Sequence, residues 1–496
     1  MSNQSQDSTG RNTAWNTGAQ LAPVASAAIA LPFLARGLGE ERLGILLLVW
    51  TVVSLASVLD FGVGRALTQM IAVRRGSGTL SELNSIIRAG VGLSGLLGLG
   101  AGALVLATSS WLTSSMPDVT SWVSEARVSL LLVGLGLPFL LLSNTFRATL
   151  DGLERFELSA RVRIPVGILT FIVPLAILPF TKRVDLAVAG LLTVRCAGSL
   201  VLGVVVTRLL SASPTSSNNT LQPLKELLHL GGWVSVSNLA SIILVYADRF
   251  LIASLVSVAA VAHYTTASEI VTRLLLVPIA VAAVWFPALA RAHQRVDDEE
   301  RSHLNERGVR LVTIVTLPIL ILLVAMADPI LGLWAGSEIA DPGAPVLQWL
   351  SLGVFMNALA QIPFATLHAR ARPDAPAILH LIELPLYLTL LWWALPTFGL
   401  VGAAMAWTAR AGFDFLGLLI LTTRLESNFS QVGQISVRLA SEGILLLLVT
   451  LALSRILGPW LGLLILVAVC SAWLWKRVLI AAWRTEISDR IQKTFC

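Results

Sequence analysis

The chain has 496 residues, of which 55% are hydrophobic and only 13% are charged, and its formal net charge is +6. A soluble protein carries roughly 25% charged residues, so this composition excludes a soluble chain and predicts a protein that crosses a membrane several times. The three cysteines, Cys196, Cys470 and Cys496, lie too far apart in the sequence for a disulfide framework or a metal-binding knuckle. The basic residues collect in one set of loops, a pattern that does not favour nucleic-acid binding.

About fourteen apolar segments, most of them roughly 17–25 residues long, can each cross ~30 Å of hydrocarbon as an α-helix. We expect the first six at residues 15–36, 43–70, 87–108, 128–150, 164–180 and 186–210. The others are expected at residues 232–255, 259–289, 309–327, 344–367, 377–395, 401–422, 435–457 and 461–475. The sequence therefore predicts an all-α polytopic membrane protein.

The Lys and Arg residues of the loops divide unevenly between the two sides of the predicted membrane. Roughly twenty lie on the side of the two termini and about six on the other side. Because loops rich in Lys and Arg remain in the cytoplasm, we expect both termini to be cytoplasmic. The polar segment 1–14 lacks the basic, apolar and cleavage regions of a secretory signal, so we expect it to be a cytoplasmic tail.

A linker rich in Ser, Asn and Pro at residues 211–231 divides the chain into two halves. We expect an N-lobe of six spans at residues 15–210 and a C-lobe of six spans at residues 232–424. Two further spans are expected within residues 425–475. The last segment, residues 476–496, is expected to be an amphipathic helix on the cytoplasmic surface.

The two halves align with each other at an offset of roughly 217 residues. Four matches recur in order: Trp15 with Trp233, Gln-Leu-Ala at residues 20–22 with Asn-Leu-Ala at residues 238–240, Ala-Thr-Leu at residues 148–150 with residues 365–367, and Thr-x-Arg at residues 193–195 with residues 408–410. Each Ala-Thr-Leu copy is followed by an arginine, Arg155 or Arg372. Each copy holds an even number of spans, so both copies enter the membrane in the same sense. Parallel repeats of this kind predict two pseudo-symmetric lobes with a cleft between them.

Charged residues inside the predicted spans are the candidates for function, because a charge at membrane depth costs about 2.5–3.5 kcal/mol on insertion scales. The candidate substrate-binding cations are Arg65, Arg147, Arg195, Arg249, Arg273 and Arg410. The candidate acidic residues for coupling or ion pairing are Asp60, Asp248, Glu269, Glu383 and Asp414.

Structural ion pairing is the alternative explanation for some of these charges. Glu269 and Arg273 are four residues apart, as are Arg410 and Asp414, so each pair lies on one helix face. Arg195 has no acidic residue three or four positions away in its span. A buried cation without such a partner is suited to a passing phosphate group.

Other motifs favour structural roles. The glycine-rich span 87–108 predicts close helix packing rather than a phosphate loop. The chain has no Gly-Lys pair, so an ATP-binding P-loop is absent. His380 and Glu383 are three residues apart and could relay a proton. A histidine in this position more often has a structural role in the packed core. The histidines show no metal-ligand spacing, and we expect neither a metal nor a cofactor.

Four long stretches carry a resemblance to a known family. These are LGEERLGILLLVWTVVSLASVLDFGVGRALTQ at residues 38–69, the segment from YADRF to ALAR at residues 246–291, LWAGSEIADPG and its continuation at residues 333–374, and HLIELPLYLTLLWW and its continuation at residues 380–410. They resemble the polysaccharide-transport family of Wzx-type flippases for lipid-linked oligosaccharides. That family belongs to the superfamily of multidrug, oligosaccharidyl-lipid and polysaccharide exporters.

The resemblance implies a core of two six-helix lobes plus two C-terminal helices in the bacterial inner membrane. It implies that an undecaprenyl-diphosphate-linked repeat unit of O-antigen or exopolysaccharide moves from the cytoplasmic to the periplasmic leaflet by alternating access. The cavity of such proteins is cationic, and the six candidate arginines fit this property. The implied partners are the lipid-linked oligosaccharide and membrane lipids, with a glycan polymerase and a chain-length regulator as candidate protein partners.

Two other functions remain in competition. A proton- or sodium-coupled multidrug exporter of the same superfamily is expected to have an acidic cavity, whereas the candidates here are six arginines and five acidic residues. A membrane glycosyltransferase or glycan polymerase is expected to need a substantial aqueous domain, and the sequence has no loop of sufficient length. We therefore expect a transporter rather than an enzyme.

Overall fold

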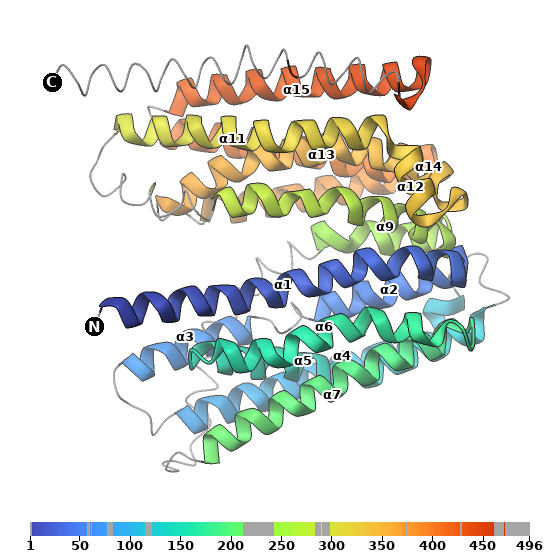
Figure 1. Cartoon of the computed structure of the whole chain (residues 1–496), viewed down its shortest axis with the longest axis vertical. Helices are drawn as coiled ribbons and strands as arrows, with labels where there is room; N and C mark the ends of the chain where they lie inside the picture. The colour runs from blue at the N-terminus through green and yellow to red at the C-terminus, as the bar shows by residue number, and fades with distance from the viewer. Residues whose placement is uncertain are drawn as a thin grey trace. The chain divides into compact units, whose positions relative to one another are not determined.

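The computed structural model describes residues 2–56, 60, 62–76, 83–114, 122–211, 243–282, 289, 298–370, 372, 374–426, 429–460 and 471. Within these ranges the regular elements are helices, and ten of them are long and apolar enough to cross a membrane (Figure 1). The prediction of an all-α, multi-pass membrane protein is confirmed. Most of the predicted linker and C-terminal tail lies outside the described residues.

The chain divides into two compact units, Met1–Ala262 and His263–Cys496. In the first unit, α5 packs against α4 and α7, and α6 packs against α1 and α7. Its helices are α1 (Ser2–Leu38), α2 (Glu40–Ala56), α3 (Val63–Gly76), α4 (Leu83–Ser114), α5 (Val123–Gly152), α6 (Phe156–Ile177) and α7 (Val184–Ser211), with a further helix at residues 243–255.

In the second unit, α13 packs against α11, α12 and α14. Helix α9 (Val258–Thr272) runs across the boundary between the units and continues into the 3₁₀ turn η2 (Arg273–Leu275). The remaining helices are α11 (Asp298–Ala325), α12 (Ala327–Ala335), α13 (Ser337–Ala369), α14 (Asp374–Leu425) and α15 (Phe429–Leu457). Helix α14 breaks at Gly399, which has φ 60° and ψ −142°, between the two spans expected at residues 377–395 and 401–422.

The expectation of one continuous span at residues 43–70 is wrong, because two helices share this segment. Helix α2 ends at Ala56 and α3 begins at Val63. The Asp60 carboxylate accepts hydrogen bonds from the backbone N–H groups of Gly62 and Gly64, at 3.0 and 3.1 Å. An acidic side chain in this position satisfies N–H groups that a helix start leaves without partners. Asp60 therefore stabilises the start of α3 inside the membrane segment.

Glycines allow α4 and α5 to approach each other closely. A Cβ atom on Gly98 would lie 2.5 Å from Pro138 Cα, and one on Gly102 would lie 2.4 Å from the Gly134 carbonyl oxygen. Neither position can accept a side chain without moving backbone. The prediction that these glycines serve helix packing is confirmed.

The predicted repeat is visible in the local geometry of each unit. Helices α5 and α13 end with nearly identical backbone angles, φ −80° and ψ 2° at Leu153 and φ −79° and ψ 2° at Arg370. In both copies the arginine two residues later donates its backbone N–H to the leucine of Ala-Thr-Leu. The Arg155 to Leu150 distance is 2.8 Å, and the Arg372 to Leu367 distance is 3.0 Å.

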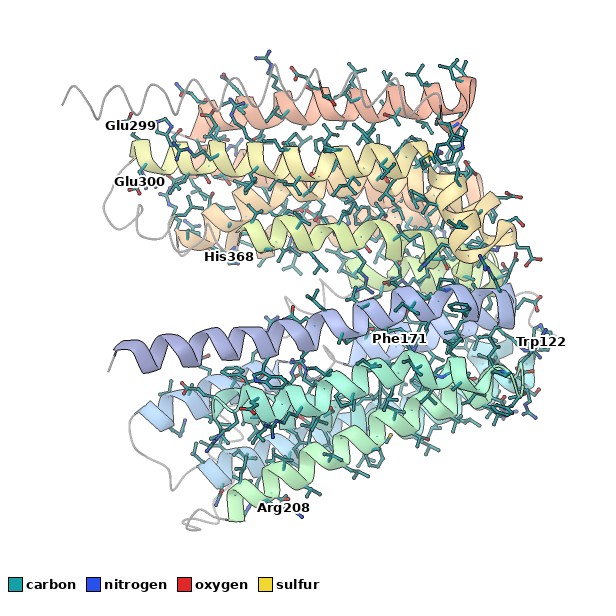
Figure 2. All side chains as sticks on the ribbon, in the orientation of Figure 1. Trp122, Phe171, Arg208, Glu299, Glu300 and His368 are labelled. Carbon is teal, nitrogen blue, oxygen red and sulfur yellow. The ribbon has the colours of Figure 1, made fainter. Side chains whose placement is uncertain are left out.

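An ion pair ties three helix starts together at one end of the first unit. Glu125, at the start of α5, accepts two hydrogen bonds from Arg42 of α2, at 2.8 and 3.1 Å. It also accepts the backbone N–H of Val184, the first residue of α7, at 2.9 Å. The Arg42 guanidinium lies 3.6 Å from the centre of the Trp122 ring, which Figure 2 shows at this end of the bundle.

We expect Glu125→Ala to destabilise the protein by about 2–3 kcal/mol, because it leaves a guanidinium and a buried N–H without an acceptor. Thermal unfolding of the purified protein in detergent measures the effect. The matched control is Glu157→Ala, which removes the exposed Glu157–Arg161 pair and should cost less than about 1 kcal/mol. Equal unfolding temperatures for the two variants would contradict this account of the network.

Candidate functional site

A polar pocket of about 480 Å³ lies between α3 and α5 in the first unit. It brings together three of the residues singled out from the sequence, Asp60, Arg65 and Arg147. The full lining is Asp60, Gly64, Arg65, Thr68, Gln69, Ala72, Asn144, Arg147, Ala148 and Asp151. A pocket rich in charges and amides, built from helices of a membrane protein, is the first candidate for the functional site.

Helical periodicity explains why these residues share one pocket. On α3 and on the C-terminal part of α5 the lining positions recur every three or four residues, which places them on one face of each helix. The Thr68 hydroxyl donates to the Ala148 carbonyl at 3.0 Å and joins the two faces. Asn144 donates to the carbonyl of Ala56, the last residue of α2, at 3.2 Å. The break between α2 and α3 is therefore stabilised from α5.

Within the described residues, the charged side chains of the pocket include a guanidinium with a free donor. The Arg147 Nε atom lies 3.9 Å from an Asp151 oxygen, beyond hydrogen-bond distance, and it has no hydrogen-bond acceptor among the described residues. Arg163 of α6 lies within electrostatic range of Arg147 and Asp151. The lining therefore carries two guanidinium groups and two carboxylates, and the Asp60 carboxylate already accepts two backbone N–H groups at the start of α3.

The sequence reasoning missed Asp151 as a member of this site and Arg163 as a charge that acts on it. Both fall in the charged segment DGLERFELSARVR, which we expected to be a loop between spans. In the structure α5 extends to Gly152 and α6 begins at Phe156, so Asp151 lies in the last turn of α5, where it lines the pocket, and Arg163 lies within α6. The many charged residues of this segment, directly after a predicted span, were the sequence feature that could have indicated these residues.

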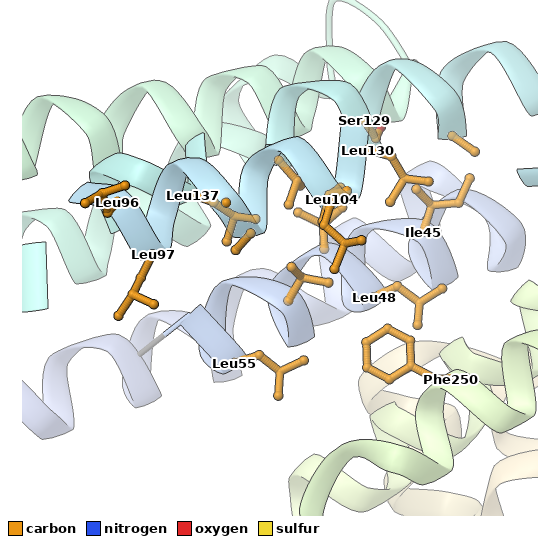
Figure 3. Close-up of a pocket in the computed structure, with 17 residues that line it drawn as sticks. Ile45, Leu48, Leu55, Leu96, Leu97, Leu104, Ser129, Leu130, Leu137 and Phe250 are labelled. Atoms are coloured by element: carbon orange, nitrogen blue, oxygen red, sulfur yellow. The ribbon is translucent and has the colours of Figure 1, made fainter. Parts of the chain in front are cut away.

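A second pocket in the same unit is almost wholly apolar. It has a volume of about 580 Å³ and is lined by Leu, Ile, Val, Ala and Gly residues of α2, α4 and α5, with Phe250 of the helix at residues 243–255 (Figure 3). Its one hydroxyl-bearing lining residue, Ser129, donates to the Glu125 carbonyl at 2.8 Å. This pocket offers no free polar group to a ligand.

The other arginines expected at the site lie outside the polar pocket. On α7, Arg195 has a buried Nε atom without a hydrogen-bond acceptor, and no carboxylate partner is found for it within the described residues. Arg249 donates to the Thr51 hydroxyl at 3.0 Å and lies 5.2 Å from the Tyr246 ring, so it links its helix to α2. Asp248 is buried and accepts the Arg249 backbone N–H at 2.8 Å.

Arg273 forms an ion pair with Glu269 one turn earlier, as the spacing suggested. The Arg273 side chain is about half exposed, at 47%. The pair therefore lies on an exposed face of α9 and η2 within the second unit. This geometry fits a structural ion pair rather than a cation that is free to bind substrate.

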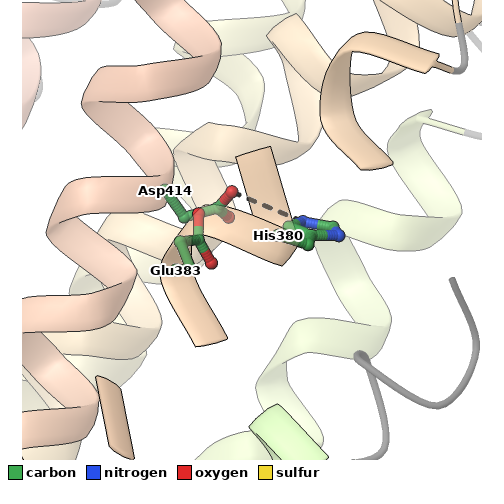
Figure 4. Close-up of side chains that lie close together, drawn as sticks. All are labelled: His380, Glu383 and Asp414. Atoms are coloured by element: carbon green, nitrogen blue, oxygen red, sulfur yellow. Dashed lines mark ion pairs between the residues drawn. The ribbon is translucent and has the colours of Figure 1, made fainter. Parts of the chain in front are cut away.

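The second unit contains a separate buried cluster on the two parts of α14. Glu383 is 1% exposed, and one of its oxygens lies 3.9 Å from Arg410 Nη1. His380 Nε2 lies 3.6 Å from Asp414 Oδ1, and Figure 4 shows Glu383 beside this pair. Arg410 and Asp414 thus each pair with a residue on the other half of α14, and not with each other.

The cluster can take up one cation. Two carboxylates and one guanidinium give a net charge of −1 when the imidazole is neutral, so one proton or monovalent ion would neutralise it. Potential ligand atoms of His380, Glu383 and Asp414 lie within 4.8 Å of one another. The guanidinium next to Glu383 opposes a divalent metal at the same place.

Comparisons with known proteins agree with these features. A family model described as "Polysaccharide biosynthesis protein" matches residues 9–293, more than half of the chain. A protein of Shigella flexneri named "Putative O-antigen transporter" is 28% identical over 418 residues, which cover 84% of this chain and 98% of that protein. The "Probable flippase AglR" of Haloferax volcanii is 25% identical over 267 residues, 53% of this chain and 55% of that protein.

Solved structures share the fold. The lipid II flippase MurJ in an inward closed conformation matches with a TM-score of 0.68 and 15% identity, over 92% of this chain and 98% of that chain. An inward-facing multidrug resistance MATE family transporter of the MOP superfamily matches with a TM-score of 0.67 and 16% identity, over 83% and 98%. The resemblance found in the sequence is confirmed: the chain belongs to the polysaccharide biosynthesis protein family and has the fold of the MurJ and MATE structures.

Proposed function

We propose that this protein is a flippase for an undecaprenyl-diphosphate-linked oligosaccharide, an O-antigen or exopolysaccharide repeat unit. The observation that carries the proposal is the pocket containing Arg65 and Arg147, at the α3 and α5 helix ends, in a chain of this family. The name of the Shigella flexneri relative points to the same class of substrate. We assign the protein to the bacterial inner membrane with both termini in the cytoplasm.

The diphosphate is the part of such a substrate that the pocket suits best. Guanidinium groups bind phosphate oxygens through paired, charge-assisted hydrogen bonds. Arg147 Nε has no acceptor in the part of the chain that the structure describes, and Arg163 adds a positive charge that acts on the same region. In this proposal the anionic group is withdrawn from hydrocarbon into the pocket, and alternating access then exposes it to the opposite leaflet. The implied protein partners are a glycan polymerase and a chain-length regulator.

The competing function, export of cationic drugs, fits this pocket less well. Arginines would repel a cation, and the Asp60 carboxylate is already occupied by backbone N–H groups. The likeness to MATE transporters concerns the fold. We likewise propose a transporter rather than an enzyme.

We place ion coupling at the cluster of His380, Glu383, Arg410 and Asp414. Uptake of one cation would neutralise its net charge, and loss of that cation would restore a buried charge that favours another conformation. The energy of a proton or sodium gradient could enter the transport cycle at this point.

Replacing Arg147 with Gln should lower surface glycan by about tenfold or more, because a charged hydrogen bond contributes about 1.5–3 kcal/mol and about 1.4 kcal/mol is tenfold in affinity. Complementation of a deletion strain, with the protein level measured in parallel, gives the result. Arg161→Gln is the matched control, since Arg161 is 62% exposed. Normal glycan in the Arg147→Gln strain would refute the role of the pocket.

Asp151→Asn separates substrate binding from ion pairing at Arg147. If Arg147 serves the substrate, this change removes a competing anion, and export should be maintained or increased. If Arg147 serves only to pair with Asp151, the two substitutions should impair export equally. Equal impairment at equal protein level would contradict the proposal.

Replacing Arg195 with Met tests the cation of α7 whose Nε atom is buried. Because no carboxylate partner is found for this cation within the described residues, we expect the apolar side chain to raise the unfolding temperature. Export should fall in the same variant if Arg195 meets a phosphate during transport. A stable variant with normal export would exclude that role.

Glu383→Gln should abolish the response of transport to an imposed proton or sodium gradient, because the uncharged amide no longer needs a cation. Proteoliposomes carrying a fluorescent lipid-linked glycan allow this measurement. Glu338→Gln, at an exposed position on α13, is the control. An unchanged gradient response in Glu383→Gln would place coupling elsewhere.

A further inference from the structure

The apolar pocket and the polar pocket are built on the same helices of the first unit. On α5, the apolar pocket includes Ala126, Val133 and Leu137, and the polar pocket includes Asn144 and Asp151. These positions follow one another at helical intervals, so they form a single stripe along one face of α5. The two helices that precede α4 also divide between the pockets, because α2 lines the apolar pocket and α3 lines the polar one.

We propose that the two pockets are the two ends of one amphiphilic groove, which holds the polyprenyl tail of the substrate beyond its diphosphate. The anionic group occupies the polar end at Arg65 and Arg147. The isoprenoid chain runs along α5 into the apolar pocket. This inference rests on the proposed function and adds the location of the lipid tail.

The chemistry of the apolar pocket fits a hydrocarbon chain. The hydroxyl of Ser129 is used within its own helix, so a polar ligand would lose its hydrogen bonds to water without replacement. The pocket is open on the side of α4, where Leu96 and Leu104 are 71% and 65% exposed. In a membrane, such an opening lets a chain enter sideways from the bilayer.

The length of the groove selects a polyprenyl chain over the acyl chain of a phospholipid. With a rise of about 1.5 Å per residue, the apolar pocket begins about 15 Å from Arg147 at Leu137 and ends about 32 Å away at Ala126. One leaflet contributes about 15 Å of hydrocarbon. An acyl chain whose phosphate lies at Arg147 would therefore reach only the start of the pocket, whereas a long isoprenoid chain extends through it.

Gly100 offers a way to fill the apolar pocket without disturbing the fold. It lines the pocket, and a Cβ atom at this position would have no neighbour within 4 Å. Gly92 lies two turns earlier on the same helix, also has no neighbour within 4 Å, and does not line the pocket. Gly100→Leu and Gly92→Leu are thus a matched pair.

The test compares binding of radiolabelled undecaprenyl diphosphate and geranyl diphosphate to the full chain in phosphatidylcholine nanodiscs. Gly100→Leu should weaken binding of undecaprenyl diphosphate by about tenfold, the loss expected from displacing about two methylene groups. Geranyl diphosphate has a tail too short to reach the pocket, so its affinity should be unchanged. Gly92→Leu should bind both ligands as the wild type does.

The outcomes separate the groove from the proposed function. If Gly100→Leu binds undecaprenyl diphosphate as tightly as Gly92→Leu, the groove is refuted and the proposed function stands. If Gly100→Leu instead loses a copurified phospholipid and keeps its affinity for undecaprenyl diphosphate, the pocket holds a bilayer acyl chain and the inference is overturned. If the wild type binds neither diphosphate, the proposed function itself fails.

Discussion

The structure depends on the fact that hydrocarbon offers no partner to a charge or to an open backbone group. The segment joining α2 and α3 shows how the chain meets this constraint. Asp60 accepts the N–H groups at the start of α3, and Asn144 of α5 donates to the carbonyl at the end of α2. Side chains of the same unit thus pair with the described backbone groups on either side of the break, next to the polar pocket.

The same constraint separates the arginines by role. Arg42 and Arg273 each form a close ion pair with a carboxylate. Arg147 and Arg410 each lie 3.9 Å from a carboxylate, and Arg195 has no carboxylate partner in the described part of the chain. A diphosphate requires guanidinium groups that can donate hydrogen bonds to its oxygens, and the polar pocket holds two of them, Arg65 and Arg147. The pocket at the α2–α3 break therefore carries the functional proposal.

Composition and apolar segment length were sufficient to predict an all-α, multi-pass protein, because hydrocarbon thickness leaves few alternatives. The repeat was also predictable, and the matching hydrogen bonds at Arg155 and Arg372 confirm it. The break after Ala56 was not predicted, because residues 43–70 are mostly apolar and the effect of Asp60 depends on backbone geometry. Periodicity alone also missed the electrostatic influence of Arg147 on Arg163, since the two residues lie on different helices.

The most direct test of the central claim is an experimental structure of the full chain in nanodiscs with undecaprenyl diphosphate. We predict density for the diphosphate within hydrogen-bond distance of the Arg65 and Arg147 guanidinium groups, between α3 and α5. A diphosphate bound elsewhere, with Arg147 closed onto Asp151 and the pocket empty, would contradict the account.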